Sequence, residues 1–296
     1  MRQAILITAY KNEKQIYDII SLLGKEFDFY IHIDKKSPMS LDEVQGKGNI
    51  HIFKKYIVNW GSVNHLKAIL FLSKKALENN SVGYFHLVTG QDFPVQTKNY
   101  FTNELDTNKD YLEYFEMPAK CWDNGGMYRL EYYNCYEFFN AKTALGRLKI
   151  DFLLKVQKIL KIKRKIPYEK FKKLYGGSTY WSLKRDTLQY VLNFTENNND
   201  FFKRMNFTFC SEEIYFQTIL LNSKFRDNII NDSLRYIDWS SGRGGYPAFL
   251  DITDYEKIIS SNKIFARKFH EEKSEELKNR LLKKMTDEIR STNASS

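Results

Sequence analysis

Cysteine is scarce in this sequence, and the few cysteines present do not support a disulfide-based fold. The chain has three of them in 296 residues, Cys121, Cys135 and Cys210, and none has the C-x-x-C spacing typical of metal or redox sites. Three cysteines cannot all pair with one another. We therefore expect reduced thiols in the protein core and no metal site built from cysteine.

Long apolar runs are also missing. No uninterrupted stretch approaches the roughly 20 apolar residues that a membrane-spanning helix needs. The apolar part of residues 1–8 is too short for a secretory signal. These two absences predict a cytoplasmic protein.

Several catalytic signatures do not occur. The sequence has no Walker loop, no G-x-G-x-x-G after a strand, no G-x-S-x-G elbow and no H-E-x-x-H. Kinases, dehydrogenases, elbow hydrolases and zincins are therefore disfavoured. An Asp-x-Asp triplet, the metal-holding pair of many nucleotide-sugar transferases, is absent as well. If a diphosphate leaves during the reaction, cations of the protein must neutralise its charge.

Positive charge is abundant and concentrated in one segment. The formal net charge is +10, and residues 147–173 alone contain eleven basic and two acidic residues, a net charge of +9. Apolar residues recur there at helical spacing, which predicts a basic amphipathic helix. It could contact an anionic membrane surface or be a solvated helix at the rim of the protein. Nucleic-acid binding is the weakest alternative, because no binding module surrounds the segment.

The first half of the chain alternates between strand-like and helix-like stretches. Strands are expected at 4–9, 29–33, 50–53 and 84–89, and helices at 13–23 and 62–77. This alternation predicts an α/β fold with a parallel or mixed sheet. Polar residues follow the strands at Tyr10, at 34–37 and at 90–92, where open α/β sheets bind ligands.

Charged groups of the second half offer a chemistry for group transfer. Arg243 lies in a glycine-rich loop, and Arg267 and Lys268 follow an expected helix at 254–260. Such cations can stabilise a leaving phosphate. Glu212 and Glu213 begin an apolar helical run, where acids often only interact with the helix dipole. Alternatively, one of them is a general base that deprotonates a sugar hydroxyl.

Seven blocks of the sequence occur in a recognisable order. They lie at 31–37, 58–63, 87–94, 176–181, 211–218, 234–239 and 265–269. Their order resembles that of the core-2/I-branching β-1,6-N-acetylglucosaminyltransferase and peptide O-xylosyltransferase family, glycosyltransferase family 14. The resemblance runs from about residue 5 to about residue 270.

The resemblance implies a GT-A-type α/β fold, with a mixed, mainly parallel central sheet flanked by helices. It implies a single domain over 1–296, with a donor half at about 1–120 and a helix-rich acceptor and catalytic half at about 121–270. A C-terminal helix and tail then occupy 271–296. The activity it implies is inverting transfer from a UDP-sugar donor, with no cofactor and no metal.

Residue by residue, the resemblance assigns roles in catalysis and donor binding. Glu213 matches the catalytic base, and Glu212 is then expected to have only an electrostatic role in the first helical turn. Lys268 matches the lysine at the donor diphosphate, with Arg267 beside it. The family's second diphosphate cation has no counterpart at Gly245 or Ala248. Arg243 is the remaining candidate for that role.

Further positions complete the expected site. Asp34 resembles the acid that contacts the nucleoside, and Gly90, Gln91 and Asp92 resemble the residues that line the donor site. A tight turn capped by Asp92 would explain part of that pattern too. On the acceptor side the residues expected to bind the sugar are Glu113 and Trp239. Trp60 and Trp181 are expected in the core or in the pocket wall.

Departures from the animal members suggest a biological setting. Those enzymes have a membrane anchor and several disulfides, whereas this chain begins at its first strand, which predicts a bacterial cytoplasmic enzyme. Its acceptor would be a surface glycan on a lipid-diphosphate carrier, and segment 147–173 would contact the inner face of the membrane. N-acetylglucosamine is the expected donor sugar, with xylose as an alternative. A non-catalytic carbohydrate-binding or membrane-binding relative and a nucleic-acid-associated protein are the competing hypotheses.

Overall fold

The computed structural model of the protein describes residues 1–166, 170–240 and 242–294. Its central sheet has seven strands in the order β3-β2-β1-β4-β7-β6-β8 within these residues. β7 runs antiparallel to β4 and β6, and the other neighbours are parallel. The predicted mixed, mainly parallel sheet is thus confirmed. The strands are β1 (Arg2–Ala9), β2 (Phe27–Ile33), β3 (Ile50–Phe53), β4 (Val82–Thr89), β6 (Asp110–Met117), β7 (Leu174–Lys184) and β8 (Ile229–Ile230).

A second, three-stranded sheet lies beside the central one. It consists of β5 (Asp92–Pro94), β10 (Phe265–Arg267) and β9 (Arg235–Ile237), in that order. β10 pairs antiparallel with β5 and parallel with β9. Since β5 follows β4 after a short turn, this small sheet brings the end of β10 back to the end of β4.

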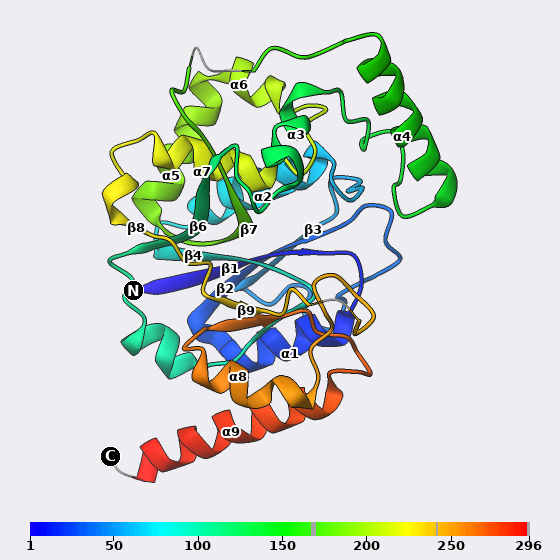
Figure 1. Ribbon diagram of the computed structural model, residues 1–296. Helices are drawn as coiled ribbons and strands as arrows, with labels where there is room; N and C mark the ends of the chain where they lie inside the picture. The colour runs from blue at the N-terminus through cyan, green and yellow to red at the C-terminus, as the bar shows by residue number, and fades with distance from the viewer. Residues whose placement is uncertain (167–169, 241, 295–296) are drawn as a thin grey trace.

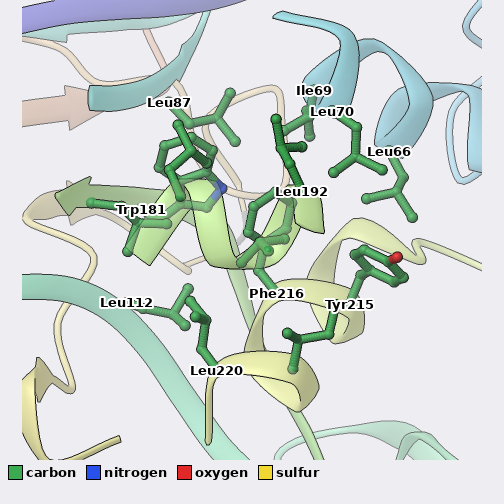
Figure 2. Close-up of a cluster of buried hydrophobic side chains, with 14 of the residues drawn as sticks. Leu66, Ile69, Leu70, Leu87, Leu112, Trp181, Leu192, Tyr215, Phe216 and Leu220 are labelled. Atoms are coloured by element: carbon green, nitrogen blue, oxygen red, sulfur yellow. The ribbon is translucent and has the colours of Figure 1, made fainter. Parts of the chain in front are cut away.

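The central strands are buried on both faces, as their continuous apolar sequences require. Leu6 of β1 packs in one hydrophobic cluster, and its neighbours Ile5 and Ile7 pack in the other. Helices α2, α5 and α7 lie on one side of the sheet, and α1, α8 and α9 lie on the other (Figure 1). Figure 2 shows part of the first cluster, where Trp181 and Phe216 meet residues of α2.

The helices have the following bounds. The α-helices are α1 (Glu13–Leu23), α2 (Val63–Leu77), α3 (Tyr128–Glu131), α4 (Ala144–Ile159), α5 (Arg185–Asn197), α6 (Asn199–Arg204), α7 (Glu212–Leu221), α8 (Tyr255–Ser260) and α9 (Glu275–Ala294). Short 3-10 turns lie at Gly24–Glu26, Asp123–Gly126, Arg226–Asn228 and Ile252–Asp254, and a π turn lies at Tyr100–Glu104. The expected helices at 13–23 and 62–77 correspond to α1 and α2.

The basic segment 147–173 is not one amphipathic helix. α4 ends at Ile159, and Arg164 is drawn into the protein, where it donates to the carbonyl oxygens of Arg204 at 2.7 Å and Asn206 at 2.6 Å. The helix prediction is therefore wrong beyond Ile159. Residues 167–169, which include Glu169, lie outside the described residues. Ion pairs join Lys163 to Glu131, Lys170 to Asp200, and Lys173 to Glu116.

The structure can be compared with two further predictions, the one about the cysteines and the one about membrane-spanning helices. The three cysteines are free, but Cys210 alone is buried, whereas Cys121 is exposed, so the expectation of core thiols fails for Cys121. Within the described part of the chain, no helix is both long enough and apolar enough to cross a bilayer.

Candidate active site

The candidate site lies where β1, β2 and β4 end. These strands are parallel, so their carboxyl ends share one edge of the sheet. Asp34 follows β2 and is buried, and its backbone N–H donates to the Ala9 carbonyl at 2.8 Å. The Asp34 carboxylate accepts from the backbone N–H groups of Lys36 at 3.1 Å and Val58 at 3.2 Å. It thereby fixes two loops at this edge.

The turn after β4 is held by its own side chains. The Asp92 carboxylate accepts from Thr89 twice, from the backbone N–H at 2.6 Å and from Oγ1 at 2.5 Å, so Asp92 caps this turn. Gly90 donates its N–H to the Thr8 carbonyl, and the Gln91 carbonyl accepts from the N–H of Phe269 at 2.9 Å. The last bond joins the ends of β4 and β10. Burial leaves the side-chain nitrogen of Gln91 without a hydrogen-bond partner in the described residues.

Arg267 packs inward from the end of β10. Its guanidinium lies 4.6 Å from the centre of the Tyr180 ring, and its Nε lies 3.6 Å from an Asp92 oxygen. Only 14% of the side-chain surface is exposed. Arg267 therefore neutralises the buried Asp92 and presents little of its charge to a ligand.

Lys268 belongs to a group of cations around Tyr10, directly after β1. Lys142 donates to the Tyr10 hydroxyl at 3.2 Å, and Lys11 lies 5.5 Å from the centre of the Tyr10 ring. Burial lowers the pKa of Lys268, and the charges of Arg267, Lys11 and Lys142 lower it further. Burial opposes ionisation of Tyr10, but the hydrogen bond from Lys142 and the neighbouring lysines outweigh it, so its pKa is lowered.

These lysines, which we call the lysine cluster (Lys11, Lys142 and Lys268), lack acidic partners. None of the three forms an ion pair with a carboxylate in the part of the chain that the structure describes. Like charges gathered without counterions favour binding of an anion. The arrangement therefore suits a ligand with concentrated negative charge, such as a diphosphate.

Glu213 lies in the first turn of α7, next to Glu212, which is joined through His65 to Thr8 near the end of β1. Its Oε2 accepts from Arg129 of α3 at 2.6 Å, and 26% of its side-chain surface stays exposed. Burial raises the pKa of Glu213, the Arg129 charge opposes this rise, and the charge of Glu212 adds to it. Arg129 is itself positioned over the Trp122 ring, 3.5 Å from its centre. The result is a fixed, reachable carboxylate that suits a general base.

Glu212 does more than interact electrostatically with the first turn of its helix. It is buried, and its Oε1 lies 3.0 Å from Nδ1 of His65, whose Nε2 lies 3.1 Å from the Thr8 hydroxyl. Glu212, His65 and Thr8 thus connect α7 through α2 to the end of β1. The expectation that Glu212 has only an electrostatic role in the first helical turn needs this correction.

Arg243 does not contact the lysine cluster. It forms ion pairs with three aspartates, Asp238, Asp251 and Asp254, and the Asp254 carboxylate accepts from it at 2.5 and 3.1 Å. These hydrogen bonds raise the pKa of Arg243. The role as second diphosphate cation is therefore not supported, because the charge is already neutralised within its own loop. Its neighbour Ser241 lies outside the described residues.

The two acceptor-side candidates, Glu113 and Trp239, have partners of their own. Burial raises the pKa of Glu113, which is opposed by a hydrogen bond with Ser233 and by the charge of Lys263. Trp239 follows β9 and is 55% exposed, with its ring 5.6 Å from that of Tyr246. The contacts described do not join Glu113 or Trp239 to Glu213. Trp181 is fully buried in the core, whereas Trp60 is 54% exposed.

Three residues of this edge escaped the sequence analysis. Arg129, Lys142 and His65 have no distinctive local pattern, because each acts through a partner that is remote in the chain. Lys142 could be recognised only as one more lysine before a helix. Its contact with Tyr10 spans more than a hundred residues and depends on the tertiary fold.

Together these features define an α/β protein with a partly exposed carboxylate and a cluster of lysines without acidic partners near the end of one central strand. The chain belongs to the Core-2/I-Branching enzyme family, whose model matches residues 6–258. The resemblance to glycosyltransferase family 14 is thereby confirmed.

Individual relatives extend this comparison. Xylosyltransferase 1 of Canis lupus familiaris is 23% identical over 246 residues, which are 79% of this chain and 24% of that protein. A beta-glucuronosyltransferase of Arabidopsis thaliana is 35% identical over 103 residues, or 34% of this chain and 23% of that protein. The chain thus matches about a quarter of the length of these relatives. The structural match to the apo form of mouse xyloside xylosyltransferase 1 covers 90% of this chain and 96% of the mouse chain, with 9% sequence identity and a TM-score of 0.33.

Proposed function

We propose that this protein is an inverting, metal-independent glycosyltransferase that moves a sugar from a UDP-sugar to a glycan acceptor. The observation that carries the proposal is that Glu213, beside the Glu212–His65–Thr8 connection, and the lysine cluster around Tyr10 both lie near the end of β1. Family membership supports the reaction class. The missing Asp-x-Asp triplet and the unneutralised lysines support independence from metal.

The reaction needs both groups at once. An acceptor hydroxyl loses its proton to Glu213 while its oxygen forms a bond to the anomeric carbon. The bond from that carbon to the diphosphate oxygen breaks, and UDP leaves with the electron pair. The lysine cluster stabilises the charge that develops on the departing UDP, as cations do for leaving phosphates. Attack and departure on opposite faces of the sugar invert the anomeric centre.

The donor sugar and the acceptor are part of the proposal. N-acetylglucosamine is the first candidate from the sequence resemblance, with xylose as the alternative; the relatives named above support xylose and add glucuronic acid. Thermal stabilisation by each UDP-sugar ranks the three, because a ligand that binds only the folded state raises the melting temperature. We propose a surface glycan on a lipid-diphosphate as the acceptor, reached by peripheral contact of segment 147–173 with the inner face of an anionic membrane.

Substitution of Glu213 tests the reaction assignment. Glu213→Gln keeps the size of the side chain but cannot take a proton, so transfer should fall by about 10² to 10⁴-fold. Affinity for UDP should stay nearly unchanged, because Glu213 is on the acceptor side. Lys268→Ala should instead weaken UDP binding. The readouts are sugar transfer and calorimetric UDP affinity, measured for variants with unchanged melting temperatures.

Glu256→Gln is the matched control, since Glu256 is also a first-turn acid but is 82% exposed on α8. It should retain full transfer. Full activity of Glu213→Gln would contradict the base assignment. Absence of both transfer and donor hydrolysis in the parent protein, with UDP binding intact, would favour the non-catalytic relative. Salt-sensitive binding of DNA or RNA without affinity for UDP would favour a nucleic-acid protein.

A further inference from the structure

α4 exposes a stripe of large apolar side chains. Leu145, Leu148, Phe152 and Ile159 are 62%, 66%, 64% and 69% exposed, respectively. Their spacing of three, four and seven residues places all four on one side of the helix. We call them the α4 stripe. Exposed apolar residues that are contiguous in this way mark a surface that binds a protein partner, a membrane or a ligand.

The orientation of the stripe is fixed by the opposite side of the helix. The buried residues of α4 are Gly146, Ile150 and Gln157, which lie across the helix from Phe152. The Gln157 side chain accepts from the Tyr133 N–H at 2.8 Å and donates to the Tyr133 carbonyl at 3.1 Å. α4 is thus attached to the protein by one face, at the margin of the molecule in Figure 1, and the stripe faces outward.

Positive charge surrounds the stripe. The cations of α4 are Arg147, Lys149, Lys155 and Lys158, against one acid, Asp151. None of these four cations forms an ion pair with a carboxylate in the described ranges of the chain. An apolar stripe flanked by unneutralised lysines is complementary to a lipid bilayer, whose acyl chains are apolar and whose headgroups can be anionic.

We propose that α4 docks on an anionic lipid bilayer, with the α4 stripe inserted at the boundary of headgroups and acyl chains. Lys149 and Lys155 flank the stripe and would contact lipid phosphates while their stems stay in the apolar layer. A second copy of the chain is the disfavoured occupant, because pairing two such faces would bring like charges together.

Docking in this way would bring the candidate active site to the membrane. Lys142 lies just before α4 and donates to Tyr10 at the carboxyl end of β1. The membrane-facing helix therefore begins at the lysine cluster. This consequence for a lipid-linked acceptor rests on the proposed glycosyl transfer, whereas the docking of α4 rests on the exposed α4 stripe and its cations.

Vesicle sedimentation with the full chain tests the docking. We expect binding to vesicles that contain about 30% phosphatidylglycerol in phosphatidylcholine, and little binding to phosphatidylcholine alone. Leu148→Gln with Phe152→Gln should weaken the partition coefficient more than about tenfold, because two apolar side chains no longer enter the bilayer. Lys149→Gln with Lys155→Gln should weaken it about fivefold per lysine. These side chains are exposed, so the melting temperature should not change.

Lys25→Gln with Lys47→Gln is the matched charge control, because both lysines are exposed in connecting segments away from α4. It should bind like the parent. Equal binding by the parent and the α4 variants would overturn the proposal, as would binding that is independent of anionic lipid. A dimer of the parent in light scattering without lipid, lost in Leu148→Gln with Phe152→Gln, would assign the stripe to a second copy. If the parent protein transfers no sugar to a soluble acceptor but still binds anionic vesicles, the proposed function fails and the docking of α4 stands.

Discussion

At the scale of single residues, Arg129 forms an ion pair with Glu213 and favours its ionised form. Burial raises the pKa of Glu213, and the Arg129 charge works against that rise. Loss of this charge should therefore raise the pKa further. A base works only when deprotonated, so the acid limb of kcat/KM against pH should move to higher pH in Arg129→Gln.

Arg129→Lys is the control for this prediction, because it restores a cation near Glu213. Its acid limb should lie close to that of the parent. The measurement is kcat/KM as a function of pH for the parent, Arg129→Gln and Arg129→Lys. An unshifted limb in Arg129→Gln would show that Glu213 is not the group that titrates in the rate.

His32 makes a second prediction at the residue scale. Burial lowers the pKa of His32 to about 4, and its neutral Nε2 accepts from the Tyr56 N–H at 3.0 Å. The unfolded chain, with an ordinary histidine pKa near 6.5, then takes up this proton first. Stability from His32 is therefore full above about pH 6.5 and is lost as the pH falls toward 4.

The expected loss is about 3 kcal/mol, from about 1.4 kcal/mol for each pH unit between the two pKa values. Urea unfolding of the parent at pH 7.5 and 4.5 measures it. In His32→Gln the free energy of unfolding should decrease less between pH 7.5 and pH 4.5, because the Gln side chain can accept the hydrogen bond from the Tyr56 N–H without titrating. Equal decreases in both proteins would mean that other groups cause the acid sensitivity.

At the scale of elements, the contact between β6 and β7 leaves no room for a side chain at Gly177. A Cβ there would lie 1.9 Å from the carbonyl oxygen of Glu113 on β6. Gly177→Ala should therefore push the two strands apart and lower the free energy of unfolding by about 2 to 3 kcal/mol. Gly48→Ala should be nearly neutral, since a Cβ added to Gly48 would have no atom within 4 Å.

Urea unfolding of both glycine variants checks this prediction. If Gly177→Ala unfolds at the same urea concentration as the parent, then β6 and β7 can separate without loss of stability. Because the pairing of β6 with β7 also carries Glu113, a second readout is available. The affinity for a glycan acceptor should fall in Gly177→Ala if Glu113 binds the acceptor sugar.

The elements that the sequence predicted correctly are those determined by local pattern. β1, β2 and β4 are mostly apolar runs that are buried on both faces, and α1 and α2 have an apolar period near 3.6. The pairing of β6, β7 and β8 and the small second sheet join segments far apart in the chain, which no local period specifies. The same limit applies to the site. Glu213 and Lys268 lie in recognisable blocks, whereas Arg129 and Lys142 reach the site only through the tertiary fold.

At the scale of the whole molecule, ligand binding should be visible in global stability. UDP at about 100 times its dissociation constant should add about 2.7 kcal/mol to the free energy of unfolding and raise the melting temperature by several degrees. Because the lysine cluster supplies the positive charge, the shift should be the same in EDTA and in Mg²⁺ or Mn²⁺. Lys142→Gln should reduce it, since Lys142 is a member of that cluster.

Thermal denaturation with and without UDP measures these shifts. Lys74→Gln is the control, because Lys74 lies on α2 in an exposed pair with Glu196. It should show the parent shift. Stabilisation that disappears in EDTA and returns with a divalent metal would refute metal-independent donor binding.

The ion pairs of Arg243 also affect how the protein would meet a sugar. They tie together both ends of the loop that carries Trp239 and Tyr246, two exposed aromatic rings. The described residues of this loop, 238–240 and 242–254, therefore lose conformational entropy during folding and not during binding. A sugar that stacks on these rings would find them already in place, so little of its binding free energy would be spent on ordering the protein. Arg243 would then contribute to affinity without touching either substrate.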